Sequence, residues 1–82
     1  MGGAGSYEAA AEEIEQAVLA APWLADGYYD LGVIQEKAGK FSQATQNFKL
    51  YLLAAPQSRN ATPVQVKIYE LERMKKEKEK DQ

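Results

Sequence analysis

The sequence predicts an all-α fold, an antiparallel helix-turn-helix array of four helices, and three observations support it. The chain resembles itself after a shift of 34 residues, which places Ala20-Ala21-Pro22 on Ala54-Ala55-Pro56 without a change. Apolar residues recur at the spacing of an amphipathic helix in each segment between these punctuating positions. No stretch alternates between apolar and polar residues over more than a few positions, so no strand is expected.

The first and third helices are expected over residues 6–21 and 41–55, because both carry the same apolar stripe. In each copy, apolar or small residues stand at relative positions 0, 3, 7, 10, 11 and 14: Tyr7, Ala10, Ile14, Ala17, Val18 and Ala21, then Phe41, Ala44, Phe48, Tyr51, Leu52 and Ala55. A glycine precedes each helix, and Pro22 and Pro56 end them because the residue before a proline is forced out of the α region.

The second helix is expected over 24–38, where the residues that face the core are spaced by four and three: Leu24, Tyr28, Leu31, Gln35 and Ala38. The fourth helix is expected over 62–78. Thr62 and Gln65 fit a capping box at its start, and Pro63 suits the first helical position, where its missing N–H costs nothing. Its apolar stripe is Val64, Ile68 and Leu71.

The predicted core joins the stripes of all four helices. It comprises Ile14, Ala17, Leu24, Tyr28, Leu31, Ala44, Phe48, Leu52, Ile68 and Leu71.

The 34-residue period carries a recognisable pattern: Tyr28-x-x-Leu31-Gly32-x-x-Gln35, then Ala44-x-x-x-Phe48, then Pro56. This pattern resembles the tetratricopeptide repeat (TPR), a helix-turn-helix unit of the same length. The chain departs from the family pattern at three positions: Tyr28 replaces a tryptophan, Gln35 replaces an aromatic residue, and Tyr51 stands where alanine is usual.

The resemblance implies one domain over residues 1–82. Residues 4–22 correspond to the second helix of a partial repeat, and 23–56 to a complete repeat. Residues 59–80 take the place of a capping helix with a charged tail, with Gln65-Val66 where the family has Leu-Gly.

Gly32 lies inside the second helix, where glycine costs roughly 1 kcal/mol relative to alanine. In TPR hairpins the two helices approach each other most closely at this glycine and at the alanine of the second helix, here Gly32 and Ala44. The resemblance therefore implies that Gly32 permits a tight helix-helix contact, and that replacing it with leucine unfolds or opens the domain.

Composition argues against several classes of function. The chain has no histidine and no cysteine, which removes the commonest nucleophile-base pairs and the usual zinc ligands, so no enzyme activity, metal or cofactor is expected. The net charge of −2 gives no reason to expect nucleic acid. No apolar run approaches the roughly 20 residues that span a bilayer, so no membrane partner is expected.

Protein-protein recognition remains. In TPR proteins the first helices of successive repeats line a concave groove that holds a peptide or a helix, and the matching positions here are Asp26, Tyr29, Val33, Glu36 and Lys37. The helical spacing of Tyr29, Val33 and Lys37 places them off the core stripe and suggests that Tyr29 anchors a mixed apolar and polar peptide. Packing of Tyr29 and Val33 against the last helix is the open alternative.

A second class of function also stays open. Repeat arrays usually need three or more units to bury a continuous core, and this chain has about one and a half with a cap. Tyr7 and Ile14 of the first helix would then lack a covering helix. The alternative function is therefore a self-assembling scaffold element, in which a homodimer or the rest of a larger protein completes the partial repeat.

Overall fold

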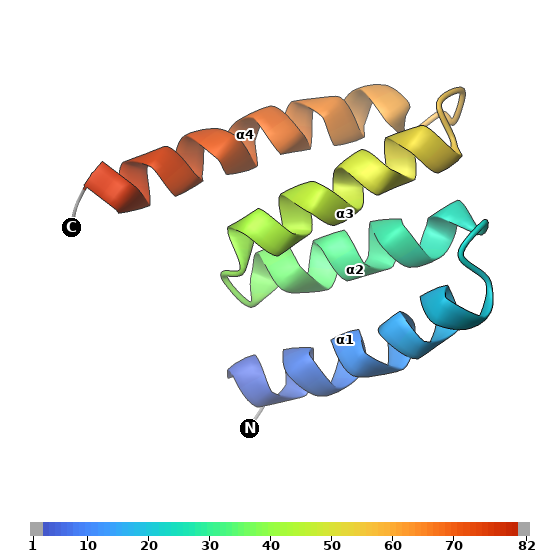
Figure 1. Cartoon of the computed structure of the whole chain (residues 1–82). Coiled ribbons are helices and arrows are strands. Elements are labelled where there is room, and N and C mark those ends of the chain that lie inside the picture. Colours follow the sequence, from blue (N-terminus) through green and yellow to red (C-terminus); the bar gives the residue numbers. More distant parts are fainter. Residues whose placement is uncertain (1–2, 81–82) are drawn as a thin grey trace.

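A computed structural model describes the backbone of residues 3–80 and the side chains of residues 6–76 (Figure 1). It consists of four helices: α1 (Gly3–Ala20), α2 (Ala25–Lys37), α3 (Phe41–Ala54) and α4 (Ala61–Lys80). No strand occurs in this described part. The predicted all-α helical array is confirmed, and each helix ends within three residues of its expected bounds.

The helices are stacked in the order of the sequence, each running antiparallel to the one before it (Figure 1). Contacts join α1 to α2, α2 to α3, and α3 to α4. The central pair, α2 and α3, therefore has a neighbour on each side. In contrast, α1 and α4 form the two ends of the stack, and each has one outer face without a helix.

The turn between α2 and α3 explains the glycine that precedes the third helix. Gly39 has a φ of +81°, in the left-handed region that a residue with a Cβ rarely adopts. The N–H of Gly39 donates to the carbonyl of Glu36, and the N–H of Lys40 donates to that of Gln35. These two bonds form the Schellman motif that ends many helices, and they reverse the chain in few residues.

The start of α4 differs from the capping box that the sequence indicated. The helix begins at Ala61, and the N–H of Val64 donates to the carbonyl of Asn60. Thr62 and Pro63 therefore lie at the second and third helical positions, not at the cap and the first position. Proline is still tolerated there, because the first N–H groups of a helix have no partner within it.

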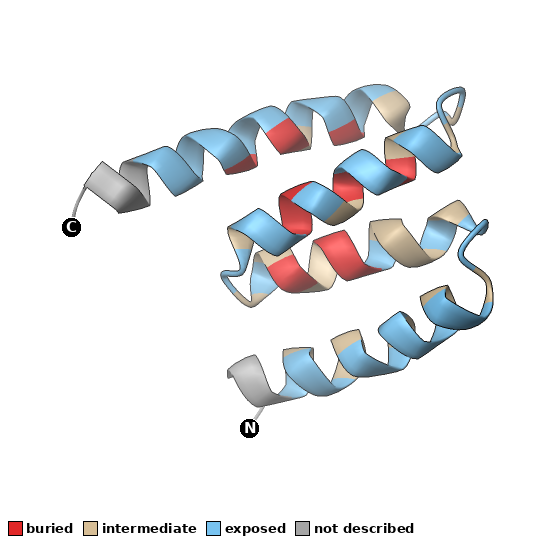
Figure 2. Cartoon of the chain, viewed as in Figure 1, coloured by how far each residue is buried: buried red, intermediate tan, exposed pale blue. Residues whose placement is uncertain are grey.

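The core lies between α2, α3 and α4 (Figure 2). Of the predicted core residues, Leu31, Ala44, Phe48, Ile68 and Leu71 are buried, which confirms them. Ile14, Tyr28 and Leu52 are half-buried. Two further residues complete the buried apolar set: Tyr51 and Val64.

Two core predictions are wrong. Leu24 is 56% exposed because it stands before α2 as an extended residue, so its side chain does not join the helix stripe. Ala17 is exposed because it lines an open pocket beside the start of α2, and no further helix covers it. The concern that Tyr7 and Ile14 are bare is also wrong, since both are half-buried.

Gly32 is buried where α2 meets α3, as the resemblance implied. A Cβ on Gly32 would lie 2.6 Å from Cε1 of Phe48, with two more atoms of that ring at 2.8 Å. The side chain that leaves no room for a Cβ at residue 32 is thus that of Phe48. No atom of Ala44 is among the three nearest to this Cβ position. The Phe48 ring fills the space that a side chain at residue 32 would occupy.

Gln35 fills the position where the TPR pattern has an aromatic residue, and its side chain is buried. Its Oε1 accepts a hydrogen bond of 2.7 Å from Nδ2 of Asn47 on α3. The polar group is therefore satisfied inside the α2–α3 contact, which removes most of the cost of burying it.

α4 is packed in a different register from the one that the 34-residue period implied. On α2, Gly27 meets Val18 of α1 and Ile34 lines a pocket with α1 residues, and the buried Leu31 lies between them on the same side of the helix. On α4, the residues buried with α3 are Val64, Ile68 and Leu71, each 37 positions later. The structural equivalents of Leu31-Gly32 are thus Ile68-Tyr69, not Gln65-Val66, because the α3–α4 connection is longer than the α1–α2 connection.

Candidate partner-binding surface

The five sequence-predicted contact residues lie on α2, and four of them follow one side of the helix. Asp26 and Lys37 are eleven residues apart, which is close to three full turns, so both stand on the side that carries Tyr29 and Val33. We call this surface, together with Lys67 and Glu70 of α4, the α2/α4 face. Asp26 and Lys37 are exposed, whereas Tyr29, Val33 and Glu36 are half-buried.

The ring of Tyr29 rests on two buried aromatic rings of α3. Its centroid lies 5.9 Å from that of Phe48 in a T-shaped arrangement, and 5.4 Å from that of Tyr51. Such pairs stabilise by roughly 0.5–1.5 kcal/mol beyond the area they bury. Tyr29 is therefore held in one position, with part of its surface still open.

Tyr29 and Val33 differ from the expectation of free apolar side chains. Both pack against the buried cluster that α3 and α4 build, so the core uses a large part of their surface. The sequence could not reveal this, because the helical spacing showed only that they lie off the Leu24-Tyr28-Leu31 stripe. It did not show that α3 and α4 would reach that side of α2.

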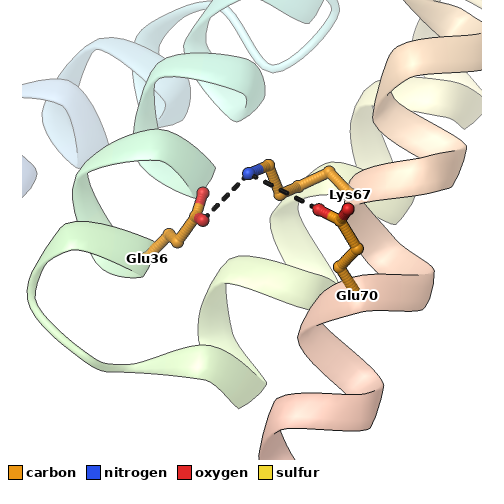
Figure 3. Close-up of polar contacts among 3 residues, drawn as sticks. All are labelled: Glu36, Lys67 and Glu70. Atoms are coloured by element: carbon orange, nitrogen blue, oxygen red, sulfur yellow. Dashed lines mark hydrogen bonds and ion pairs between the residues drawn. The ribbon is translucent and has the colours of Figure 1, made fainter.

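A charged network connects the α2/α4 face across the stack (Figure 3). Nζ of Lys67 donates to Oε2 of Glu36 at 3.0 Å and lies 3.9 Å from Oε1 of Glu70. The hydrogen bond to the Glu36 carboxylate raises the pKa of Lys67 above its usual value, partial burial opposes this, and the nearby negative charges of Glu36 and Glu70 add to it. Lys67 is thus a charged bridge between α2 and α4.

The structure also exposes large apolar side chains that the sequence did not single out. Leu19 and Trp23 are 74% and 72% exposed near the α1–α2 connection. Leu24 follows them and lines a small pocket with Val18 and Gly27. The sequence did contain an indication of this exposure, because Trp23-Leu24 lies in the α1–α2 connection, between Pro22 and the first residue of α2.

Among the described side chains, those of residues 6–76, no group of three or more acidic, histidine or cysteine residues is placed to hold a metal ion. In the same described part of the chain, no helix combines the length and the apolar character that crossing a membrane requires.

Comparisons of the chain with protein-family models, with curated proteins and with solved structures found no match. The resemblance to the tetratricopeptide repeat therefore depends on the residues and contacts of this chain alone: the 34-residue period, the Gly32–Phe48 contact and the helical hairpins.

Proposed function

We propose that this chain is a protein-interaction module, similar to a TPR unit, that binds a peptide or a helix of a partner protein through the α2/α4 face. The observation that supports this is the position of Tyr29. Its ring is half-buried and fixed on Phe48 and Tyr51, and it lies beside charged groups from two helices. A fixed aromatic ring loses little conformational freedom on binding, which is why tyrosine is enriched among the residues that dominate interfaces.

The charges on α2 indicate what kind of peptide would fit. Asp26 and Lys37 carry opposite charges at the two ends of the helix, about 16 Å apart at 1.5 Å per residue. Tyr29 and Val33 lie between them. The proposed ligand therefore has a basic side chain near Asp26, an apolar side chain on Tyr29 and an acidic group near Lys37, spread over about five extended residues.

The resemblance to the TPR family also argues against one class of partner, the C-terminal tails of chaperones. The TPR subclass that binds the C-terminal tails of chaperones uses lysine and asparagine at the positions of Tyr29 and Val33 in this chain. A mixed apolar and charged segment therefore suits this face better than a purely acidic tail.

The test is selection of random peptides on the chain, followed by binding measurements with synthetic copies of the selected peptides. Asp26→Lys and Lys37→Glu should each weaken binding about two- to fivefold, because exposed ion pairs contribute up to about 1 kcal/mol. The double variant should prefer peptides with the opposite order of charges. Gln46→Lys on α3 is the control, since it introduces a charge at an exposed position outside the α2/α4 face.

The proposal fails if selection returns no peptide. It also fails if the selected peptides bind all three α2 variants as tightly as the original chain.

A further inference from the structure

An open apolar pocket lies where α1 ends and α2 begins, with a volume of about 220 Å³. Its lining is apolar except for one carboxylate and includes Ala17, Val18, Ala21, Leu24, Gly27 and Asp26. We call this pocket the α1–α2 corner. A cavity of about 150 Å³ with apolar walls holds a benzene molecule, so the corner has room for one aromatic ring.

Hydrogen bonds of the α1–α2 connection fix the walls of the corner. The N–H of Leu24 donates to the carbonyl of Ala21 at 3.0 Å. The hydroxyl of Tyr28 donates to the carbonyl of Pro22 at 2.7 Å. The pocket is therefore formed before any ligand arrives, which reduces the conformational freedom that binding would cost.

The repeat shows what fills the equivalent place one unit later. The 34-residue period places Ala17 on Tyr51. The 37-residue equivalence of α2 and α4 places Gly27 on Val64. Tyr51 and Val64 are 3% and 2% exposed and belong to one buried cluster. The hydroxyl of Tyr51 shares a hydrogen bond with that of Ser58, so an aromatic ring supplied by α3 is packed against the α3–α4 connection.

The α1–α2 corner lacks both of these larger side chains. Ala17 and Gly27 provide a methyl group and a hydrogen atom where the later unit has a ring and an isopropyl group. A Cβ on Gly27 would lie 2.7 Å from Cγ2 of Val18, so Val18 already occupies the space next to this glycine. The unfilled volume is therefore that of the missing ring at Ala17, which is exposed.

Asp26 connects the corner to the α2/α4 face. It is exposed, and it belongs both to the lining of the pocket and to the side of α2 that carries Tyr29. The ligand proposed above has a basic side chain at Asp26, so that ligand passes the mouth of the corner. In an extended segment, side chains two residues apart lie on the same side, about 7 Å from each other. A residue two positions from the basic one, on the end away from Tyr29, can therefore enter the corner.

We propose that the α1–α2 corner binds an aromatic side chain of the partner, two residues from the basic residue that pairs with Asp26. The ring takes the place that Tyr51 has in the following unit. This inference rests on the proposed function and specifies its ligand. From the corner toward Lys37, the bound segment presents an aromatic, a basic, an apolar and an acidic side chain.

The experiment compares the original chain with Ala17→Tyr, which supplies from within the ring that the corner lacks. Random peptides are selected on each chain, and calorimetry measures the binding of synthetic copies. Peptides selected on the original chain should carry phenylalanine or tyrosine two positions from the basic residue, whereas those selected on Ala17→Tyr should not. Replacing that ring with alanine should weaken binding to the original chain at least about tenfold, but binding to Ala17→Tyr by less than about twofold.

Two controls separate filling of the corner from a general effect of the substitution. Ala17→Tyr should raise the melting temperature, because its ring gains apolar contacts in the corner. Ala9→Tyr places the same side chain at an exposed position of α1, eight residues or about 12 Å along the helix axis from Ala17. It should change neither the melting temperature nor the preference for an aromatic peptide residue. The peptide with alanine in place of the ring tests the corner on the unaltered chain, so the result does not depend on how a variant folds.

Selected peptides that need Asp26 but show no aromatic preference would overturn this inference and leave the proposed function standing. Failure to select any peptide would overturn both. An aromatic preference that persists in Ala17→Tyr would place the ring outside the corner and overturn the inference. Dimerisation of the chain that is lost in Ala17→Tyr would also overturn it, because a second copy would then fill the corner.

Discussion

The helices α1 and α3 occupy equivalent places in the 34-residue period, yet their burial is very different. Ala44, Phe48 and Tyr51 of α3 are 0%, 2% and 3% exposed. Their equivalents on α1 are half-buried at Ala10 and Ile14 and exposed at Ala17. The difference arises because α3 lies between two helices, whereas α1 has a neighbour on one side only. A position in a repeat thus becomes core only when the repeats on both sides are present.

The residues of the two helices match this difference. α3 carries Phe48, Tyr51 and Leu52 where α1 carries the smaller Ile14, Ala17 and Val18, and α1 is rich in alanine. Alanine favours helix formation without needing a partner, so α1 remains helical with little buried surface. We therefore expect α3 to be the most stable part of the molecule and α1 the least.

The largest expected effect concerns the two glycines of α2. Gly32→Leu should abolish the folded state, and Gly32→Ala should lower the free energy of unfolding by about 1–2 kcal/mol, because the Phe48 ring cannot move away. Gly27→Ala is the matched variant on the α1 side. It should change stability by less than about 0.5 kcal/mol, since its Cβ meets a single methyl of Val18 at 2.7 Å on an end helix, and alanine is the better helix former.

Urea unfolding followed by circular dichroism measures both glycine variants. Equal losses at Gly27 and Gly32 would show that α1 is packed as firmly as α3.

The next effect compares two equivalent positions of the repeat. Phe48→Ala should cost about 3–5 kcal/mol, because the ring is fully buried between α2 and α4. Ile14→Ala should cost only about 1 kcal/mol, because half of that side chain already faces solvent. Thermal unfolding of the two variants measures both losses of stability. A loss for Ile14→Ala close to that for Phe48→Ala would contradict the inference that α1 is packed less firmly than α3.

A smaller effect is expected at Tyr29, on the side of α2 that faces the core. The sequence placed Tyr29 off the core stripe as an anchor for a peptide, but its contacts with Phe48 and Tyr51 predict a loss of about 1–2 kcal/mol for Tyr29→Ala. Tyr29→Phe keeps both ring contacts and should stay within about 0.5 kcal/mol of the original chain. Chemical unfolding distinguishes the two, and an unchanged Tyr29→Ala would show that the ring is free.

The smallest effect concerns the ion pairs at the two ends of the stack. The pKa of Lys67 is raised in the folded chain, so its contribution is complete below the unfolded value of about 10.4 and is lost as the pH rises through the folded value. Lys67→Met should therefore be less stable than the original chain at pH 8, by at most about 0.5 kcal/mol after solvent screening, and the gap should narrow as the pH rises past the unfolded value.

Lys40→Met tests the equivalent pair at the α1 end. Lys40 and Glu8 are 3.4 Å apart and about half exposed, so no measurable loss is expected. Urea unfolding at pH 8 measures both variants. A larger loss of stability for Lys40→Met than for Lys67→Met would contradict the expectation that the ion pair at the α4 end contributes more.

The sequence by itself determined the four helices, their order and the connections between them. Apolar spacing and proline positions are local properties, so the helix bounds were predicted to within three residues. The same local pattern identified Phe48 as core, whereas the packing role of Gly32 was implied by the resemblance to the TPR pattern. The local pattern also placed Asp26, Tyr29, Val33 and Lys37 on one side of α2.

Only the tertiary structure decided which stripe positions are buried and which neighbour buries them. Leu24 fits the helical spacing but precedes the helix, and Ala17 fits the stripe but lines an open pocket beside the start of α2. The longer connection before α4 moved its register by three residues, which placed Tyr69 outside and Lys67 against Glu36. Burial and ion pairing depend on surfaces that meet across distant segments, and a pattern along one helix does not contain that information.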